Sequence, residues 1–140
     1  MKKVSFQEAL PQLLERDPRY AEDAYHFLRE ALDFTVKLLE KPVQGPGRHV
    51  SGQELLEGIR QYALKEYGQL AMRALNTWGI HRTADFGEIV FNMVECGLLG
   101  KTDQDRVEDF AGGYDFETAF VKPFLSRRSQ NSSAPSSKRT

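Results

Sequence analysis

The sequence has a single cysteine, almost no net charge and no long apolar run. With only Cys96, no disulfide can form within the chain, which fits a reducing cytoplasm. No stretch approaches the roughly 20 apolar residues of a membrane-spanning helix, and the opening MKKVSFQEALPQLLE lacks the apolar run of a signal peptide. The formal net charge of −1 gives no strong field over the whole molecule. We therefore expect a cytoplasmic protein without a membrane segment.

Motifs of catalysis and metal binding are also lacking. His26, His49 and His81 are dispersed, and neither HExxH nor paired His/Cys spacing occurs. The triplet DFG at 85–87 spells a kinase metal-binding motif, but the glycine-rich strand and HRD loop that accompany it are missing. We predict a protein that is not an enzyme and has no cofactor or metal. The enzymatic alternative would use His49 with an aspartate or Ser51.

Charge is distributed unevenly along the chain. Residues 101–125 contain six Asp or Glu and three Lys or Arg, whereas residues 126–140 contain four Lys or Arg and no acid. The second segment, SRRSQNSSAPSSKRT, has a single Ala as its apolar content, so it cannot bury a core. A length of 140 residues suits one domain with one core. We predict a single helical domain over residues 1–125 and a disordered basic tail over residues 126–140.

The domain is expected to be mostly α-helical, with about five helices, because apolar residues recur at spacings of three and four. The expected helices open at Ser5, Pro18, Ser51, Gln69 and Thr83, and the last four end near Glu40, Gly68, Gly79 and Gly97. Capping boxes at Ser5 and Ser51, and caps at Asp17 and Thr83, mark four of the starts. Glycine inside a helix costs about 1 kcal/mol relative to alanine. Gly58 therefore indicates that a neighbouring backbone approaches the third helix closely.

The second half of the chain has the order of a winged-helix module. Residues 106–110 and 114–116, on either side of Ala-Gly-Gly, predict two short strands around a tight turn. The alternative is a last helical turn that is capped by Asp115 and runs through Phe120. We expect a helix-turn-helix or winged-helix-like second half with a short C-terminal β-hairpin. The loop 41–50, with two prolines and two glycines, is a candidate boundary within the domain.

Several sequence blocks resemble those of a known family. They are RHVSGQELLEGIR at 48–60, DFGEIVFN at 85–92 running into GLLGK at 97–101, DF at 109–110 and YDF at 114–116, with DPRY at 17–20 and AY at 24–25. Together these blocks, which cover about residues 15–120, resemble the small uncharacterised bacterial "Minf" family. The resemblance implies no particular activity, and the basic tail lies outside it.

Three groups of residues are candidate binding sites. They are an anion or partner contact (Arg48, His49, Ser51, Gly52), an acidic partner surface (Asp103, Asp105, Glu108, Asp109) and a basic surface (Arg73, Arg82). The first group lies at a helix N-terminus, where free amides and the helix dipole favour a phosphate or an acidic side chain. The alternative for this group is that Ser51 only caps the helix. The alternative for the acids is a solvated surface.

Two kinds of function follow from these patterns. The first is a non-enzymatic cytoplasmic interaction or adaptor module, whose acidic surface meets a basic protein partner. The second is a nucleic-acid-binding regulator with its fifth helix in the groove. The outward residues of that helix would be Asp85, Glu88, Asn92 and Glu95. Three of these four are acids that repel phosphates, so the first function is favoured.

Overall fold

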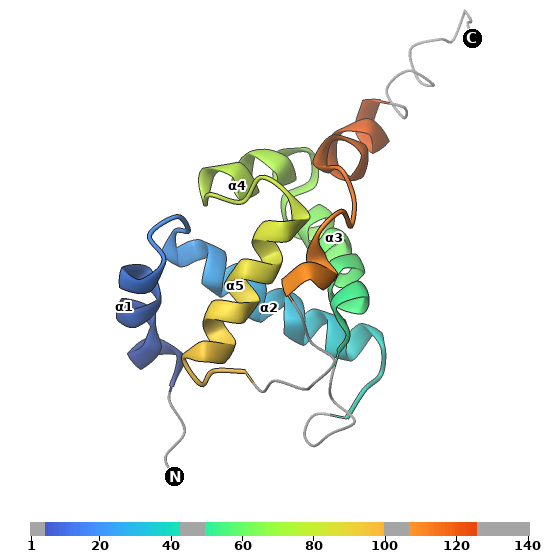
Figure 1. The fold of residues 1–140 in the computed structure, drawn as a ribbon. Coiled ribbons are helices and arrows are strands. Elements are labelled where there is room, and N and C mark those ends of the chain that lie inside the picture. The colour runs from blue at the N-terminus through green and yellow to red at the C-terminus, as the bar shows by residue number, and fades with distance from the viewer. Residues whose placement is uncertain (1–4, 43–49, 100–106, 126–140) are drawn as a thin grey trace, which may run out of the picture.

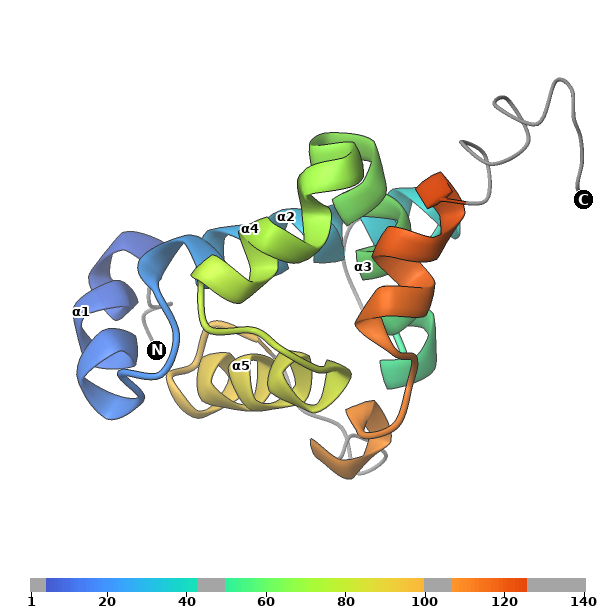
Figure 2. The ribbon, with the colours of Figure 1, turned by 90° about the horizontal axis from the view of Figure 1, so that it is seen from above.

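The structure of the protein is a computed structural model that describes residues 5–42, 50–99 and 107–125. Every element in these ranges is helical, which confirms the mostly α-helical prediction. The elements are α1 (Phe6–Arg16), α2 (Glu22–Leu38), α3 (Gly52–Tyr67), η2 (Gly68–Leu70), α4 (Ala71–Thr77), α5 (Thr83–Glu95), η3 (Val107–Phe110) and η4 (Glu117–Val121). α5 crosses in front of α2, with α1 on one side and α3 on the other (Figures 1 and 2). The predicted tail over 126–140 lies outside the described residues.

Local capping signals account for several helix ends. Both predicted capping boxes are present, in Ser5/Glu8 and in Ser51/Glu54. In each, the serine hydroxyl accepts from the backbone amide of the glutamate, and the glutamate side chain accepts from the backbone amide of the serine. α5 ends at Glu95, and Gly97 two residues later has a φ of 82°, which suits glycine. The amide of Leu98 then donates to the carbonyl of Met93 at 2.9 Å, which is the hydrogen bond of a Schellman motif.

The predicted start of α2 is wrong. The helix begins at Glu22, and the preceding Ala21 has no side chain that can cap it. Asp17 was expected to cap a helix opening at Pro18, but its carboxylate accepts from Asn92 of α5 at 2.8 Å instead. The Asp17 side chain therefore makes a tertiary contact and not the helix cap that the local pattern predicts.

α2 and α3 pack closely where Gly58 of α3 faces Thr35 of α2. A Cβ atom added at Gly58 would collide with the Oγ1 of Thr35, and it would lie 2.7 Å from the Cβ of that residue. Thr35 is fully buried, and its hydroxyl donates to the carbonyl of Ala31 at 2.7 Å. The close approach predicted at Gly58 is confirmed, although the neighbour is a side chain rather than a backbone.

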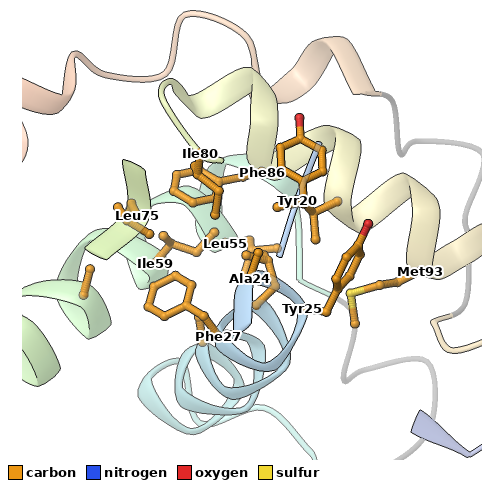
Figure 3. Close-up of a cluster of buried hydrophobic side chains, with 14 of the residues drawn as sticks. Tyr20, Ala24, Tyr25, Phe27, Leu55, Ile59, Leu75, Ile80, Phe86 and Met93 are labelled. Carbon is orange, nitrogen blue, oxygen red and sulfur yellow. The ribbon is translucent and has the colours of Figure 1, made fainter. Parts of the chain in front are cut away.

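The core draws side chains from both sides of the loop 41–50. It contains buried residues of all five α-helices together with Ile80, Phe110, Phe116, Ala119 and Phe120. Figure 3 shows its centre, where side chains from α2, α3, α4, α5 and the turns before α2 and α5 converge. The labelled residues are Tyr20, Ala24, Tyr25, Phe27, Leu55, Ile59, Leu75, Ile80, Phe86 and Met93. The helices before the loop thus share one core with those after it.

The predicted β-hairpin is wrong. Val107–Phe110 form the 3₁₀ turn η3, and Glu117–Val121 form the π-helical turn η4, which continues as α-helix over residues 122–125. We call residues 117–125 the C-terminal helix. The alternative with Asp115 as the cap is confirmed, because the Asp115 carboxylate accepts from the amide of Thr118 at 3.1 Å.

Distant side chains explain why this segment is helical. Phe116 and Phe120 are buried four residues apart on one face, with ring centroids separated by 5.2 Å, a spacing that fits a helix and not a strand. The hydroxyl of Thr83 accepts from the amide of Gly113 at 3.0 Å. Thr83 is therefore not the cap of α5, as the sequence suggested, but an anchor for the turn before the C-terminal helix.

Candidate interaction surface

Two of the four residues expected on the outward face of α5 are buried. Asp85 and Asn92 were expected to point outward, but they are 9% and 5% exposed. Along the helix only Glu95 is exposed, and Glu88 is half-buried. The expectation for Asp85 and Asn92 is therefore wrong. Their side chains instead belong to two buried polar contacts with residues 17–25.

The first contact centres on Asp17. Its carboxylate accepts from the amide group of Asn92 at 2.8 Å and from the Nε and Nη2 of Arg19, both at 2.8 Å. The Asn92 amide also donates to the hydroxyl of Tyr25 at 3.2 Å. The guanidinium of Arg19, assisted by Asn92, lowers the pKa of Asp17 from 3.8 to about 2. Burial raises the pKa of Tyr25.

The second contact centres on Asp85 in the first turn of α5. One carboxylate oxygen accepts from the hydroxyl of Tyr20 at 2.6 Å, and the other accepts from the backbone amides of His81 at 2.9 Å and Arg82 at 3.3 Å. Burial and the hydrogen bond to Asp85 raise the pKa of Tyr20. Both contacts hold residues 17–25 against α5.

The candidate anion site at the start of α3 lies beside an acidic residue of the same chain. Ser51 accepts from the amide of Glu54, and a Cβ atom added at Gly52 would lie 3.1 Å from the Cβ of Asp109. An acidic residue of the same chain therefore lies at this helix N-terminus. Arg48 and His49 lie outside the described residues.

The other candidate residues lie on separate elements. Glu108 is exposed on η3, and Asp109 beside it is half-buried. Asp103 and Asp105 lie outside the described residues. Arg73 is exposed on α4, and Arg82 is exposed just before α5. Among the residues that the structure describes, no group of three His, Cys, Asp or Glu side chains is placed to hold a metal ion.

A more extensive surface lies where α2, α3 and α4 meet. Four half-exposed rings, which we call the aromatic face, lie here: Phe34, Tyr62, Tyr67 and Trp78. Tyr62, Tyr67 and Trp78 pack against the buried ring of Phe27. Phe34 packs against Tyr62, with ring centroids 5.3 Å apart. Centroid separations are 5.6 Å from Phe27 to Tyr62, 5.6 Å from Phe27 to Trp78, and 5.6 Å from Tyr67 to Trp78. Tyr67 is 36% exposed. These rings present one connected aromatic surface to solvent.

Three carboxylates, which we call the acidic edge, border the aromatic face: Asp23, Glu30 and Glu66. All three are exposed. The hydroxyl of Tyr62 donates to Glu30 at 3.0 Å. Burial, and then the negative charges of Glu30, Glu66 and Asp23, raise the pKa of Tyr67, which places all three acids near this ring. The surface combines flat apolar rings with negative charge.

The patterns described under Sequence analysis did not predict this surface. A signal was present in α2, where Asp23, Phe27, Glu30 and Phe34 are spaced by four, three and four residues and so lie on one side of a helix. The acids on that stripe indicate that its edge faces water.

Two further apolar side chains are exposed, one on η2 and one on the C-terminal helix. Leu70 is 60% exposed and Leu125 is 51% exposed. An open cleft of about 460 Å³ separates α3 from the C-terminal helix, lined by Gln61, Leu64, Lys65, Gly68, Pro123 and Phe124. In the described part of the chain, no helix combines the length and the apolar character that crossing a bilayer requires.

No family model matches the chain, and no match was found among the curated proteins or among the solved structures. The resemblance to the "Minf" family thus depends on the sequence blocks quoted above.

Proposed function

We propose that this protein is a non-enzymatic, cytoplasmic interaction module that binds a basic protein segment at the aromatic face. The observation that supports the proposal is the set of four half-exposed rings bordered by three exposed carboxylates. Tyrosine and tryptophan are enriched among the residues that contribute most to binding. Their ring faces also attract Lys and Arg, by about 0.5–2 kcal/mol for each contact.

The aromatic face already accommodates a cation from its own chain. The Nζ of Lys65 lies 5.6 Å from the centroid of the Phe34 ring. A basic partner would make contacts of the same kind with Tyr67 and Trp78. The acidic edge would speed its association and disfavour acidic competitors. The short-range contacts of the rings with cations and the longer-range attraction of the carboxylates thus both favour a basic partner.

Affinity purification from the native cell tests this proposal. The full-length chain would be compared with Glu30→Lys/Glu66→Lys, which reverses the charge of the acidic edge, and with Glu15→Lys as a control. Glu15 is exposed on α1, so the control adds positive charge away from the aromatic face. We expect a stoichiometric, basic partner with the natural chain and the control, and its loss with the double variant.

Two results would contradict the proposal. One is a partner that the double variant retains at the level of the natural chain. The other is the absence of any stoichiometric partner in several growth states. Thermal unfolding of each variant shows whether a loss of binding reflects a loss of folding, since exposed charge reversals change stability by only about 0.5 kcal/mol.

A further inference from the structure

The C-terminal helix brings the end of the described chain beside the aromatic face. Phe124 lines the same cleft as Lys65 and Gly68. Gly68 directly follows Tyr67, a ring of the aromatic face. Leu125, the last residue that the structure describes, therefore follows Phe124 at the border of this surface. Figure 2 shows the C-terminal helix alongside α3.

The C-terminal tail, residues 126–140, and the acidic edge have opposite charges. Residues 126–140 contain four Lys or Arg and no acid, and two of these, Arg127 and Arg128, come directly after Ser126. The acidic edge contributes three carboxylates. Positive groups are present nearby as well: Lys65 lies over Phe34, and Lys122 is exposed on the C-terminal helix. The three carboxylates outnumber these two cations.

We propose that the basic tail, residues 126–140, docks on the acidic edge and covers the aromatic face of its own chain. This inference rests on the proposed function, because it makes the tail a competitor of the basic partner. Fifteen residues span up to about 50 Å when extended, which is enough to cross the face. A tethered segment of this length has an effective concentration of about 1 mM. Even a weak contact, with a Kd of about 1 mM, is then half occupied.

Trp78 reports on this docking because it is the only tryptophan of the chain and belongs to the aromatic face. Acrylamide quenching of its fluorescence would be measured on the full chain at low and high salt. We expect the quenching constant to rise by up to about twofold at high salt, where screening releases the tail. Charge reversal of the tail, by changing Arg127, Arg128, Lys138 and Arg139 to Glu, should give the same rise at low salt.

Matched variants test the surface that the tail occupies. Glu30→Lys/Glu66→Lys should raise quenching as the tail variant does, and combining the two sets should restore protection because both charges are exchanged. Lys65→Glu should lower quenching further, since it removes a repulsive charge. Glu15→Lys should have no effect. Unchanged quenching in the tail variant would overturn the proposal, as would protection that grows with protein concentration, which would assign the tail to a second copy.

The two proposals fail in different ways. If the tail variant leaves Trp78 quenching unchanged while Glu30→Lys/Glu66→Lys still loses a basic partner, the docking of the tail is wrong and the interaction module stands. If the tail protects Trp78 but no partner depends on the acidic edge, the docking stands and the proposed function is wrong. If both hold, the tail variant should recover more partner than the natural chain.

Discussion

Replacing Asp17 by Asn tests whether the buried carboxylate stabilises the fold through its charge. The pKa of Asp17 falls from 3.8 to about 2 in the folded protein. A lowered folded-state pKa stabilises the fold above the unfolded-state pKa, and that stability disappears as the pH falls through the folded-state value. The contribution of Asp17 is therefore complete above about pH 5 and is lost between about pH 4 and pH 2. One pKa unit corresponds to about 1.4 kcal/mol, so the contribution is about 2 kcal/mol.

Solvent makes this figure an upper bound. Asp17 is 8% exposed, but the side chain of Arg19, its strongest partner, is 58% exposed and is screened by water and salt. We expect Asp17→Asn to lower the free energy of unfolding by about 1–2 kcal/mol at pH 7. At pH 2 the protonated acid and the amide are close in shape and charge, so the deficit should fall below about 0.5 kcal/mol.

Urea unfolding, followed by Trp78 fluorescence at pH 7 and at pH 2, measures both values. Glu15→Gln is the matched control, since it removes one exposed acid close by in the sequence and should leave the free energy of unfolding unchanged at both pH values. If the deficit of Asp17→Asn were the same at pH 2 as at pH 7, the charge of the carboxylate would not be its source, and the reasoning would be refuted.

Two further substitutions test other contacts in the same unfolding assay. Gly58→Ala should destabilise the protein by about 1–3 kcal/mol through collision with Thr35, although alanine favours a helix by about 1 kcal/mol. Adding Thr35→Ala should recover part of this loss, and an increase in stability from Gly58→Ala alone would contradict the packing. Asp85→Ala removes the acceptor for Tyr20 and for two backbone amides, so we expect a loss of about 2–3 kcal/mol. A loss below about 0.5 kcal/mol would show that Asp85 is not required there.

Features decided within a few residues were predictable from the sequence. The capping box at Ser51 needs only Glu54, and the Schellman bond at Gly97 needs only the last turn of α5. The close approach at Gly58 could be inferred because glycine is costly in a helix, but its partner, Thr35, belongs to another helix and was not identifiable. Helix content and several helix ends therefore followed from local rules.

Features decided by distant residues were not predictable in this way. Asp17 has the pattern of a cap, and its contact with Asn92, 75 residues away, decides otherwise. The segment containing Tyr114 fits a hairpin by alternation, but its hydroxyl donates to the carbonyl of Leu56 on α3 at 2.9 Å and holds the segment against that helix. The aromatic face is of the same kind, since it forms only where three helices meet.

The contacts of α5 with residues 17–25 also bear on the order in which the protein folds. They join residues 65, 67 and 75 positions apart, Tyr20 with Asp85, Tyr25 with Asn92 and Asp17 with Asn92. Because closing a long loop has an entropic cost, we expect these contacts to form late in folding. Interactions completed late in folding act mainly on the rate of unfolding. We therefore expect that replacing the polar groups buried along α5 speeds unfolding more than it slows folding.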